Sequence, residues 1–177
     1  MKKVLVLGCC GAGKSTFSKK LQSILKLELF HLDKYYHKPN WKEPKKNEWE
    51  SIVHDLLQKP SWIMDGNFSK TMDTRIKSAD TVIYLDYPTL KCFWRVIIRA
   101  FKYHGLVRSD MANGCKEQFD LEFLYFVLTF NSKNRKENLK RLESAKANKK
   151  VYIFKSDKEA DLFLFKNRNG RTGLAKH

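Results

Sequence analysis

Residues 8–15 have the types and the spacing that bind the phosphates of a nucleotide. Glycines let successive backbone N–H groups turn toward one centre, and a helix that follows adds its unpaired N-terminal amides. In such a loop Lys14 reaches the β- and γ-phosphates, and the Ser15 hydroxyl binds Mg²⁺. The sequence therefore predicts a site for ATP and Mg²⁺. Every fixed position of the pattern GxxxxGK[ST] is matched by the run Gly8-Cys9-Cys10-Gly11-Ala12-Gly13-Lys14-Ser15.

A carboxylate stands at the end of the second predicted strand. Asp33 follows the strand 27–32, at the carboxyl edge where open α/β sheets bind ligands. A carboxylate there can orient and deprotonate an acceptor hydroxyl, although an aspartate that only caps a turn fits the sequence as well. Tyr36 and Trp41 could stack on a ring of the acceptor, or they could pack an irregular loop onto the core.

The elements that position these residues alternate in type, which is typical of an α/β fold with a largely parallel sheet. The loop 105–115 is polar, the tail 166–177 is expected to be mobile, and residues 1–177 are interpreted as one domain. We expect strands over Lys3–Leu7, Leu27–Leu32, Trp62–Met64, Thr81–Leu85 and Val151–Phe154. We expect helices over about 14–25, 47–58, 88–104, 117–130, 133–147 and 157–165.

The composition limits the partners. The formal net charge of +16 indicates either a solvated, lysine-rich surface or an attraction to nucleic acid. No run reaches about 18 apolar residues, so we expect no membrane partner. The aromatic segment 119–130 is interpreted as core or dimer packing, with an apolar substrate wall as the alternative.

The cysteines indicate a reducing compartment. The chain has four of them without metal-binding spacing and no export signal, which favours the cytoplasm. Cys9 and Cys10 are either small residues that fit a tight turn or a redox-sensitive pair in the phosphate loop.

The sequence resembles a known family at several motifs. Gly11-Ala12-Gly13-Lys14-Ser15-Thr16, His31-Leu32-Asp33 and Trp62-Ile63-Met64-Asp65-Gly66-Asn67 resemble the adenylate-kinase-related P-loop proteins. They are most similar to the group labelled DNA topology modulation proteins, and the resemblance spans about residues 1–165. It implies the P-loop NTPase fold, with helices around a five-stranded parallel sheet of order 2-3-1-4-5 and with a short lid.

The resemblance also implies roles for residues outside the phosphate loop. Arg95 and Arg99 lie on one face of a helix and resemble the pair that clamps ATP phosphates. The loop 105–115 corresponds to the lid, from which Arg108 could reach the transferred phosphoryl group. Asp65 corresponds to the carboxylate that holds Mg²⁺ through water, and Ser156 follows the last strand where such kinases contact adenine. The nucleotide is expected to be bound by Gly8, Gly11, Ala12, Gly13, Lys14, Ser15, Thr16, Arg95, Arg99 and Ser156.

One motif departs from the family. Adenylate kinases continue the third-strand Asp-Gly with Phe-Pro-Arg, whose arginine grips the monophosphate. Here Asn67-Phe68-Ser69 follows, and Arg75 or Lys70 would have to substitute. The substrate side is expected to comprise Asp33, Tyr36, Trp41, Asp65, Gly66, Asn67 and Arg75.

These features predict a kinase that transfers the γ-phosphoryl group of Mg-ATP to a small molecule. Lys14, Asp33, Arg95, Arg99 and Arg108 are the expected catalytic residues. The acceptor would be a nucleoside, a nucleotide or another hydroxyl compound. The alternative is a nucleotide-dependent protein that binds DNA or RNA and affects DNA topology. The sequence leaves the oligomeric state open.

Overall fold

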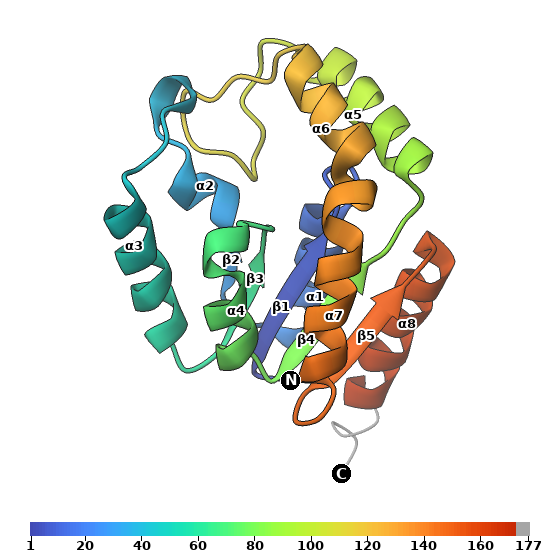
Figure 1. Ribbon diagram of the computed structural model, residues 1–177. Helices are drawn as coiled ribbons and strands as arrows, with labels where there is room; N and C mark the ends of the chain where they lie inside the picture. Colours follow the sequence, from blue (N-terminus) through green and yellow to red (C-terminus); the bar gives the residue numbers. More distant parts are fainter. Residues whose placement is uncertain (173–177) are drawn as a thin grey trace.

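The computed structural model describes residues 1–172 and contains one parallel sheet (Figure 1). The strand order is β2-β3-β1-β4-β5, which confirms the expected fold and order. The crossovers between these parallel strands are helical, as such a sheet requires. The strands are β1 (Lys3–Gly8), β2 (Leu29–His31), β3 (Trp62–Asp65), β4 (Thr81–Leu85) and β5 (Lys150–Phe154).

Helices cover both faces of the sheet. The eight helices are α1 (Lys14–Leu25), α2 (Leu32–Tyr36), α3 (Lys46–Gln58), α4 (Ser69–Ser78), α5 (Thr89–Lys102), α6 (Leu121–Phe130), α7 (Lys136–Ala145) and α8 (Asp157–Thr172), all within residues 1–172. The central strand β1 is apolar on both sides because both are buried. Val4 and Val6 pack with α1 and α8, whereas Leu5 and Leu7 pack with α3, α4 and α7. Figure 1 shows α7 in front of the sheet and α1 behind it.

Three segments differ from the sequence-based expectation. Helix α4 was not expected, because its polar sequence has few apolar positions, of which Met72 and Ile76 are buried. The segment 34–45 is not wholly irregular, since α2 runs to Tyr36 and a 3₁₀ turn covers Pro39–Trp41. The lid connection is longer than 105–115, because α5 ends at Lys102 and α6 begins at Leu121.

The two helices expected over 117–130 and 133–147 form a nearly continuous rod. A π-helical turn, Asn131–Arg135, joins α6 to α7 directly. At the other end of the chain, α8 continues to Thr172, so residues 166–172 are helical where a mobile tail was expected. The rest of that expected tail, 173–177, lies outside the described residues.

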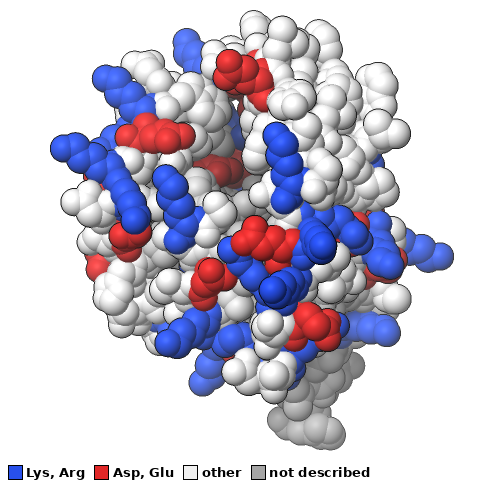
Figure 2. Space-filling view, viewed as in Figure 1, with Lys and Arg blue, Asp and Glu red and all other residues white. Residues whose placement is uncertain are grey.

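Charged side chains of both signs are spread over the molecule. Figure 2 shows lysine and arginine side chains interspersed with acidic ones over the left and lower part of the visible face, which therefore presents no unbroken basic surface. Within residues 1–172, none of the helices has the length and apolar character needed to cross a membrane.

Candidate nucleotide and acceptor site

The loops that follow β1, β2 and β3 meet at the carboxyl edge of the sheet. In the register of the sheet, His31 pairs with Asp65, and Asp65 pairs with Val6. Asp33, just beyond β2, is close enough to Lys14 and Asp65 to interact with both charges. The fold therefore brings together the phosphate loop and the two carboxylates that the sequence singled out.

The backbone of the phosphate loop requires glycine. Gly8, Gly11 and Gly13 have φ values of 146°, 81° and 88°, which L side chains rarely adopt. A Cβ atom at Gly11 would lie 2.3 Å from the carbonyl oxygen of Cys92, so this turn lies directly against α5. Gly13 caps the N-terminus of α1, and a Cβ there would meet only Arg95 Nη1, at 3.9 Å. The first amides of α1 thus border open space that a phosphate could fill.

The lysine of the motif holds its own loop. Lys14 Nζ donates hydrogen bonds to the carbonyl oxygens of Gly8 (3.0 Å) and Cys9 (3.1 Å). Ala12 is buried and its N–H donates to the carbonyl oxygen of Cys9 at 3.1 Å. Thr16, in the first turn of α1, is exposed. The ammonium group of Lys14 is therefore held at the loop where the motif requires it.

Asn67 connects the phosphate loop to the substrate side. Its Nδ2 donates to the carbonyl oxygen of Gly8 (2.8 Å), and its Oδ1 accepts from the N–H of Gly8 (3.2 Å). The side chain thereby satisfies both backbone groups of the first glycine. Asn67 was expected to contact the substrate, but in this structure its amide joins the end of β3 to the end of β1.

Arg75 and Gly66 shape the same loop from inside the protein. Arg75 is fully buried, and its guanidinium donates to the carbonyl oxygens of Gly66, Asn67 and Phe68. In this arrangement the guanidinium of Arg75 supports the loop from the interior of the protein. Gly66 has φ 128°, and a Cβ there would lie 2.9 Å from Leu32 Cβ. The arginine signal of the sequence thus marks a structural support.

Asp65 is also held by a protein partner. The Nδ1 atom of His31 lies 2.9 Å from Asp65 Oδ2, and both side chains are buried. The pair joins the ends of β2 and β3 and fixes the direction of the carboxylate that was expected to hold Mg²⁺ through water.

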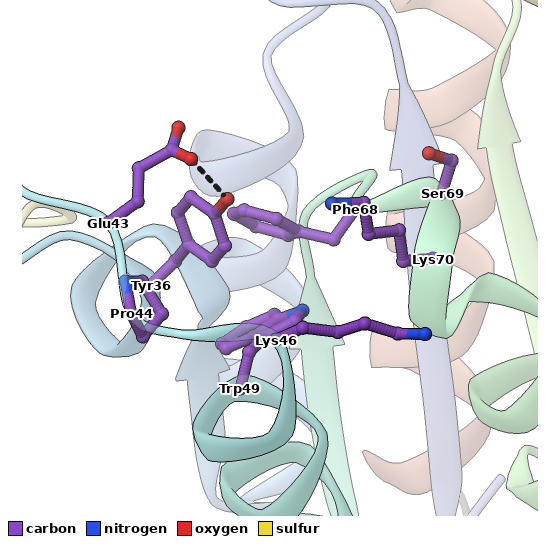
Figure 3. Close-up of a pocket in the computed structure, with 8 residues that line it drawn as sticks. All are labelled: Tyr36, Glu43, Pro44, Lys46, Trp49, Phe68, Ser69 and Lys70. Atoms are coloured by element: carbon purple, nitrogen blue, oxygen red, sulfur yellow. Dashed lines mark hydrogen bonds between the residues drawn. The ribbon is translucent and has the colours of Figure 1, made fainter.

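A cavity of about 210 Å³ lies beside residues 33–45, the acceptor loop (Figure 3). Its wall contains an aromatic cluster in which the ring centroid of Tyr36 lies 5.0 Å from the ring centroid of Trp49 and 4.6 Å from that of Phe68. The Tyr36 hydroxyl donates to Glu43 Oε2 at 2.9 Å. The cavity is lined by Tyr36, Glu43, Pro44, Lys46, Trp49, Phe68, Ser69 and Lys70. Of the two aromatic residues expected on the substrate side, Tyr36 and Trp41, Tyr36 lines this cavity.

The environment of Asp33 suits a general base. Burial raises the pKa of its carboxyl above the ordinary value of an aspartate, and the positive charge of Lys14 opposes part of that rise. His37 and Arg108 also lie close enough to lower this pKa. A carboxylate with a raised pKa binds a proton more readily than an exposed one does.

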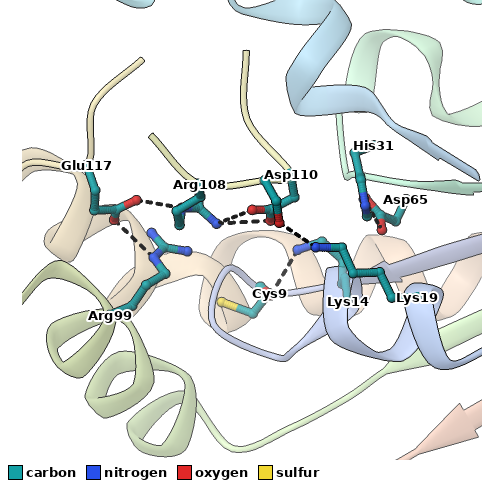
Figure 4. A network of polar contacts seen from close by, with 10 residues as sticks. Cys9, Lys14, Lys19, His31, Asp65, Arg99, Arg108, Asp110 and Glu117 are labelled. Carbon is teal, nitrogen blue, oxygen red and sulfur yellow. Dashed lines mark hydrogen bonds and ion pairs between the residues drawn. The ribbon is translucent and has the colours of Figure 1, made fainter. Parts of the chain in front are cut away.

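The lid arginines are paired with acidic residues (Figure 4). Glu117 accepts from Arg99 Nε at 3.0 Å and from Arg108 Nε at 2.7 Å. Arg108 Nη1 also pairs with Asp110 at 3.0 Å, and the Ser15 hydroxyl donates to that same carboxylate. Burial alone would raise the pKa of Asp110, but the charge of Arg108 and the hydrogen bond from Ser15 bring it below its ordinary value. The structure thus brings Arg99, Arg108 and Ser15 into one network.

The lid is fastened to the acceptor loop and to α1. Trp41 Nε1 donates to the carbonyl oxygen of Lys116 at 3.2 Å, and the N–H of Asn40 donates to the carbonyl oxygen of Gly114 at 3.4 Å. On the other side, Lys19 Nζ lies 2.6 Å from the hydroxyl of Ser109. Trp41 was expected on the substrate side; the structure gives it a hydrogen bond to the lid and a ring contact with His37, with 5.1 Å between the ring centroids.

The other two expected nucleotide contacts lie near the start of α8. Arg95 makes a double hydrogen bond with Asp157, at 2.7 and 3.2 Å. Burial would raise the pKa of Asp157, but hydrogen bonds from Arg95 and Lys91 outweigh it and lower the pKa to about 2. Ser156 caps α8, since its Oγ accepts from the N–H of Glu159 at 3.3 Å. In this state both side chains are engaged within the protein.

Sequence reasoning missed the acidic partners Asp110, Glu117 and Asp157. The basic residues were identified because cations bind phosphates. The local sequence does not show with which carboxylates these cations form ion pairs. Asp110 could have been found from its position two residues after Arg108. Glu117 is 18 residues from Arg99, so only the folded lid brings these two together.

Comparisons with known proteins identify the fold. The chain matches no protein-family model, and it matches no curated protein. Among solved structures it is similar to shikimate kinase from Bacteroides thetaiotaomicron, with a TM-score of 0.59 and 16% identity over 98% of each chain. It is also similar to shikimate kinase from Acinetobacter baumannii, with a TM-score of 0.55, 14% identity, and coverage of 100% of this chain and 96% of that one.

At these identities the likeness defines the class of fold. The chain has the P-loop kinase fold, with a five-stranded parallel sheet and flanking helices. Membership of the DNA topology modulation group stays a prediction.

Proposed function

We propose that this protein is a kinase that transfers the γ-phosphoryl group of Mg-ATP to a hydroxyl group of a small molecule. The observation that carries the proposal is that Asp33 lies close enough to Lys14 and Arg108 to interact with both charges, at the edge of the sheet where Figure 4 shows Lys14, Arg99 and Arg108. The fold of small-molecule P-loop kinases supports it. Four free cysteines are consistent with a cytoplasmic setting, which we propose with it.

The phosphate loop would hold the nucleotide. The amides of the Gly8–Gly13 loop and of the α1 N-terminus would donate to the phosphates, and Lys14 would exchange loop carbonyl oxygens for phosphate oxygens. Ser15 would bind Mg²⁺, with Asp65 acting through water. The metal would neutralise phosphate charge when bound, and oxygen ligands of this kind suit it. Ser156 would border the adenine.

Asp33 would activate the acceptor. Its carboxylate lies close enough to Lys14 for the two charges to interact, beside the phosphates that Lys14 would hold. It would orient the hydroxyl and take its proton as the oxygen attacks phosphorus. The raised pKa described above favours that proton transfer.

The lid would complete the site by an exchange of partners. Arg99 and Arg108 would leave Glu117 and Asp110 for the phosphates, and Arg95 would leave Asp157. Closure around bound ligands would also keep water from the phosphoryl group.

The acceptor side favours a ring compound. The cavity beside the acceptor loop offers aromatic edges at Tyr36 and Phe68, and the ammonium groups of Lys46 and Lys70 flank it. A nucleoside, or another ring compound with a hydroxyl group, fits this lining better than an aliphatic acceptor does. One structural neighbour is described in complex with shikimate, so shikimate belongs among the acceptors to be tested.

The decisive experiment is an ADP-release assay with Mg-ATP and separate pools of nucleosides, nucleoside monophosphates, sugars and hydroxy acids. We expect one pool to raise the rate, and Lys14→Ala and Asp33→Asn to abolish that rise. Lys20→Ala is the matched control, because Lys20 lies on the same helix and pairs with Asp161 at the surface. ATP binding without acceleration by any pool would contradict the kinase proposal and return the DNA- or RNA-binding alternative to consideration.

A further inference from the structure

The outer faces of α5 and α6 carry a large set of exposed apolar side chains. On α5 these residues recur at helical spacing, so that they form one stripe. Phe101 is 75% exposed, Leu121 is 73% exposed and Leu90 is 67% exposed, far from the values of a packed helix. This lid-flank face, as we define it, comprises Leu90, Trp94, Ile98 and Phe101 of α5 and Leu121, Tyr125, Phe126 and Leu128 of α6.

The area of the lid-flank face is that of a protein interface. With about 200 Å² taken for each whole residue, the exposed fractions of its eight residues amount to roughly 970 Å². The largest apolar patch on an ordinary monomer is about 300–600 Å², whereas each subunit of a stable dimer buries about 800 Å². The apolar area of the lid-flank face therefore exceeds that of the largest patch on an ordinary monomer and is sufficient for a dimer interface.

Three of the four cations of α5 are held by carboxylates, and the fourth, Lys102, lies over the ring of Tyr103. Lys91 and Arg95 both pair with Asp157 at 2.7 Å, and Arg99 pairs with Glu117 at 3.0 Å. Figure 2 shows the upper right of the molecule, where Figure 1 places α5 and α6, largely free of charged side chains. A chain of net charge +16 can approach its own copy most easily through such a surface.

We propose that the lid-flank face binds the same face of a second copy of this chain. A straight apolar stripe is complementary to itself when it is turned about a two-fold axis, so one surface serves both subunits. Exposed aromatic side chains such as Trp94 are the residues that dominate interface energies. Because α5 ends and α6 begins at the lid, the dimer contact fixes both anchors of the lid in each subunit.

An anionic membrane surface is the other occupant that apolar helices could meet. A membrane-binding helix carries its cations along the border of the apolar face. On α5 three of the four cations are instead paired with Asp157 and Glu117, which favours a protein partner.

The test is the mass of the full chain in solution, measured by size-exclusion chromatography with light scattering. We expect twice the chain mass of 20.9 kDa for the unmodified protein. Ile98→Glu places a charge at the exposed centre of the α5 stripe, and we expect it to weaken the dimer on the order of 100-fold, because the change acts twice across a two-fold interface. Leu162→Glu is the matched control, since Leu162 is an exposed apolar residue on α8.

The outcomes separate the possible occupants. A dimer that Ile98→Glu dissociates and Leu162→Glu leaves intact, with unchanged circular dichroism for both variants, supports the proposal. Phe101→Glu serves the same purpose if Ile98→Glu fails to fold. A monomer at micromolar concentrations overturns it, as does a dimer that persists in both lid-flank variants. Binding of the monomer to phosphatidylserine vesicles, lost in Ile98→Glu, would overturn it in favour of a lipid surface.

Discussion

At the scale of single residues, the site has its charges paired before any ligand binds. Glu117 joins two arginines, and Asp110 joins Arg108 to the hydroxyl of Ser15. A phosphate that enters must therefore replace carboxylates and does not simply meet free cations. Such replacement would change the partners of Arg99, which lies on α5, and of Arg108, which lies between α5 and α6.

Asp33→Asn should stabilise the protein at neutral pH while it removes activity. Burial raises the pKa of Asp33 in the folded state, so the ionised carboxyl costs stability once the pH rises above its unfolded value of about 3.9. We expect a higher melting temperature for the variant at pH 7, a smaller difference at acid pH, and a loss of phosphoryl transfer of about 100-fold or more.

Thermal denaturation followed across pH measures the stability effect, with Asp55→Asn as the control at an exposed position. A variant that is less stable at pH 7 than the unmodified protein would show that the ionised carboxylate contributes favourable contacts, and the assignment of its pKa would fail.

Glu117→Gln should tighten the binding of Mg-ATP. The amide keeps the shape of the side chain but removes the charge that competes with phosphates for Arg99 and Arg108, so we expect an affinity gain of roughly 3–10-fold. Calorimetric titration measures it, and Glu143→Gln, at an exposed surface pair with Lys146, is the control. Unchanged or weaker binding would mean that Glu117 positions the arginines and does not compete for them.

At the scale of elements, the site depends on how neighbouring strands end. The two hydrogen bonds between Asn67 and Gly8 hold the β3 loop against the phosphate loop. The buried guanidinium of Arg75 supports that loop through three carbonyl oxygens. Helix α4, which supplies Arg75, is thus an essential support although no reacting group comes from it.

Asn67→Asp should weaken both the fold and the binding of ATP. A carboxylate cannot donate to the carbonyl oxygen of Gly8 and repels it, so we expect a loss of about 1–3 kcal/mol in the free energy of unfolding. Urea denaturation measures this loss. Asn47→Asp is the control, because it makes the same chemical change at an exposed position in the first turn of α3, where a negative charge is tolerated. Equal stability of the two variants would contradict the role given to Asn67.

The strands and the phosphate loop could be predicted from the sequence, because apolar runs and glycine positions follow local rules. Helix α4 could not, since Thr71 and Arg75 occupy buried positions that a hydrophobic pattern treats as exposed. The continuous rod from α6 to α7 was also missed, because the polar π-helical turn looks like a break in the sequence. For the site, the cations were visible in the sequence and their acidic partners were not.

At the scale of the whole molecule, the lid and the acceptor loop meet above the sheet. Trp41 and Asn40 bind lid carbonyl oxygens, and Cys115 Sγ lies 3.2 Å from the carbonyl oxygen of Lys38. Two segments from opposite sides of the molecule therefore close over one site.

Trp41→Phe should increase ATP hydrolysis in the absence of an acceptor. The substitution removes the indole N–H that binds Lys116, and a loss of about 1 kcal/mol makes the open lid several-fold more populated. We expect a rise of about 2–5-fold in ADP release without acceptor. Phe165→Leu, at an exposed aromatic residue on α8, is the control. An equal rise in both variants would show that the hydrogen bond does not hold the lid.

The contacts that fasten the lid also set a timescale. Because the lid binds α1 through Ser109 and the acceptor loop through Gly114 and Lys116, either ligand must wait for the same opening. Association rates for nucleotide and acceptor should then level off at one common frequency as the concentration of either ligand rises. That frequency is the rate at which the lid opens, which is a property of the protein, so chemically different ligands would have the same limiting rate.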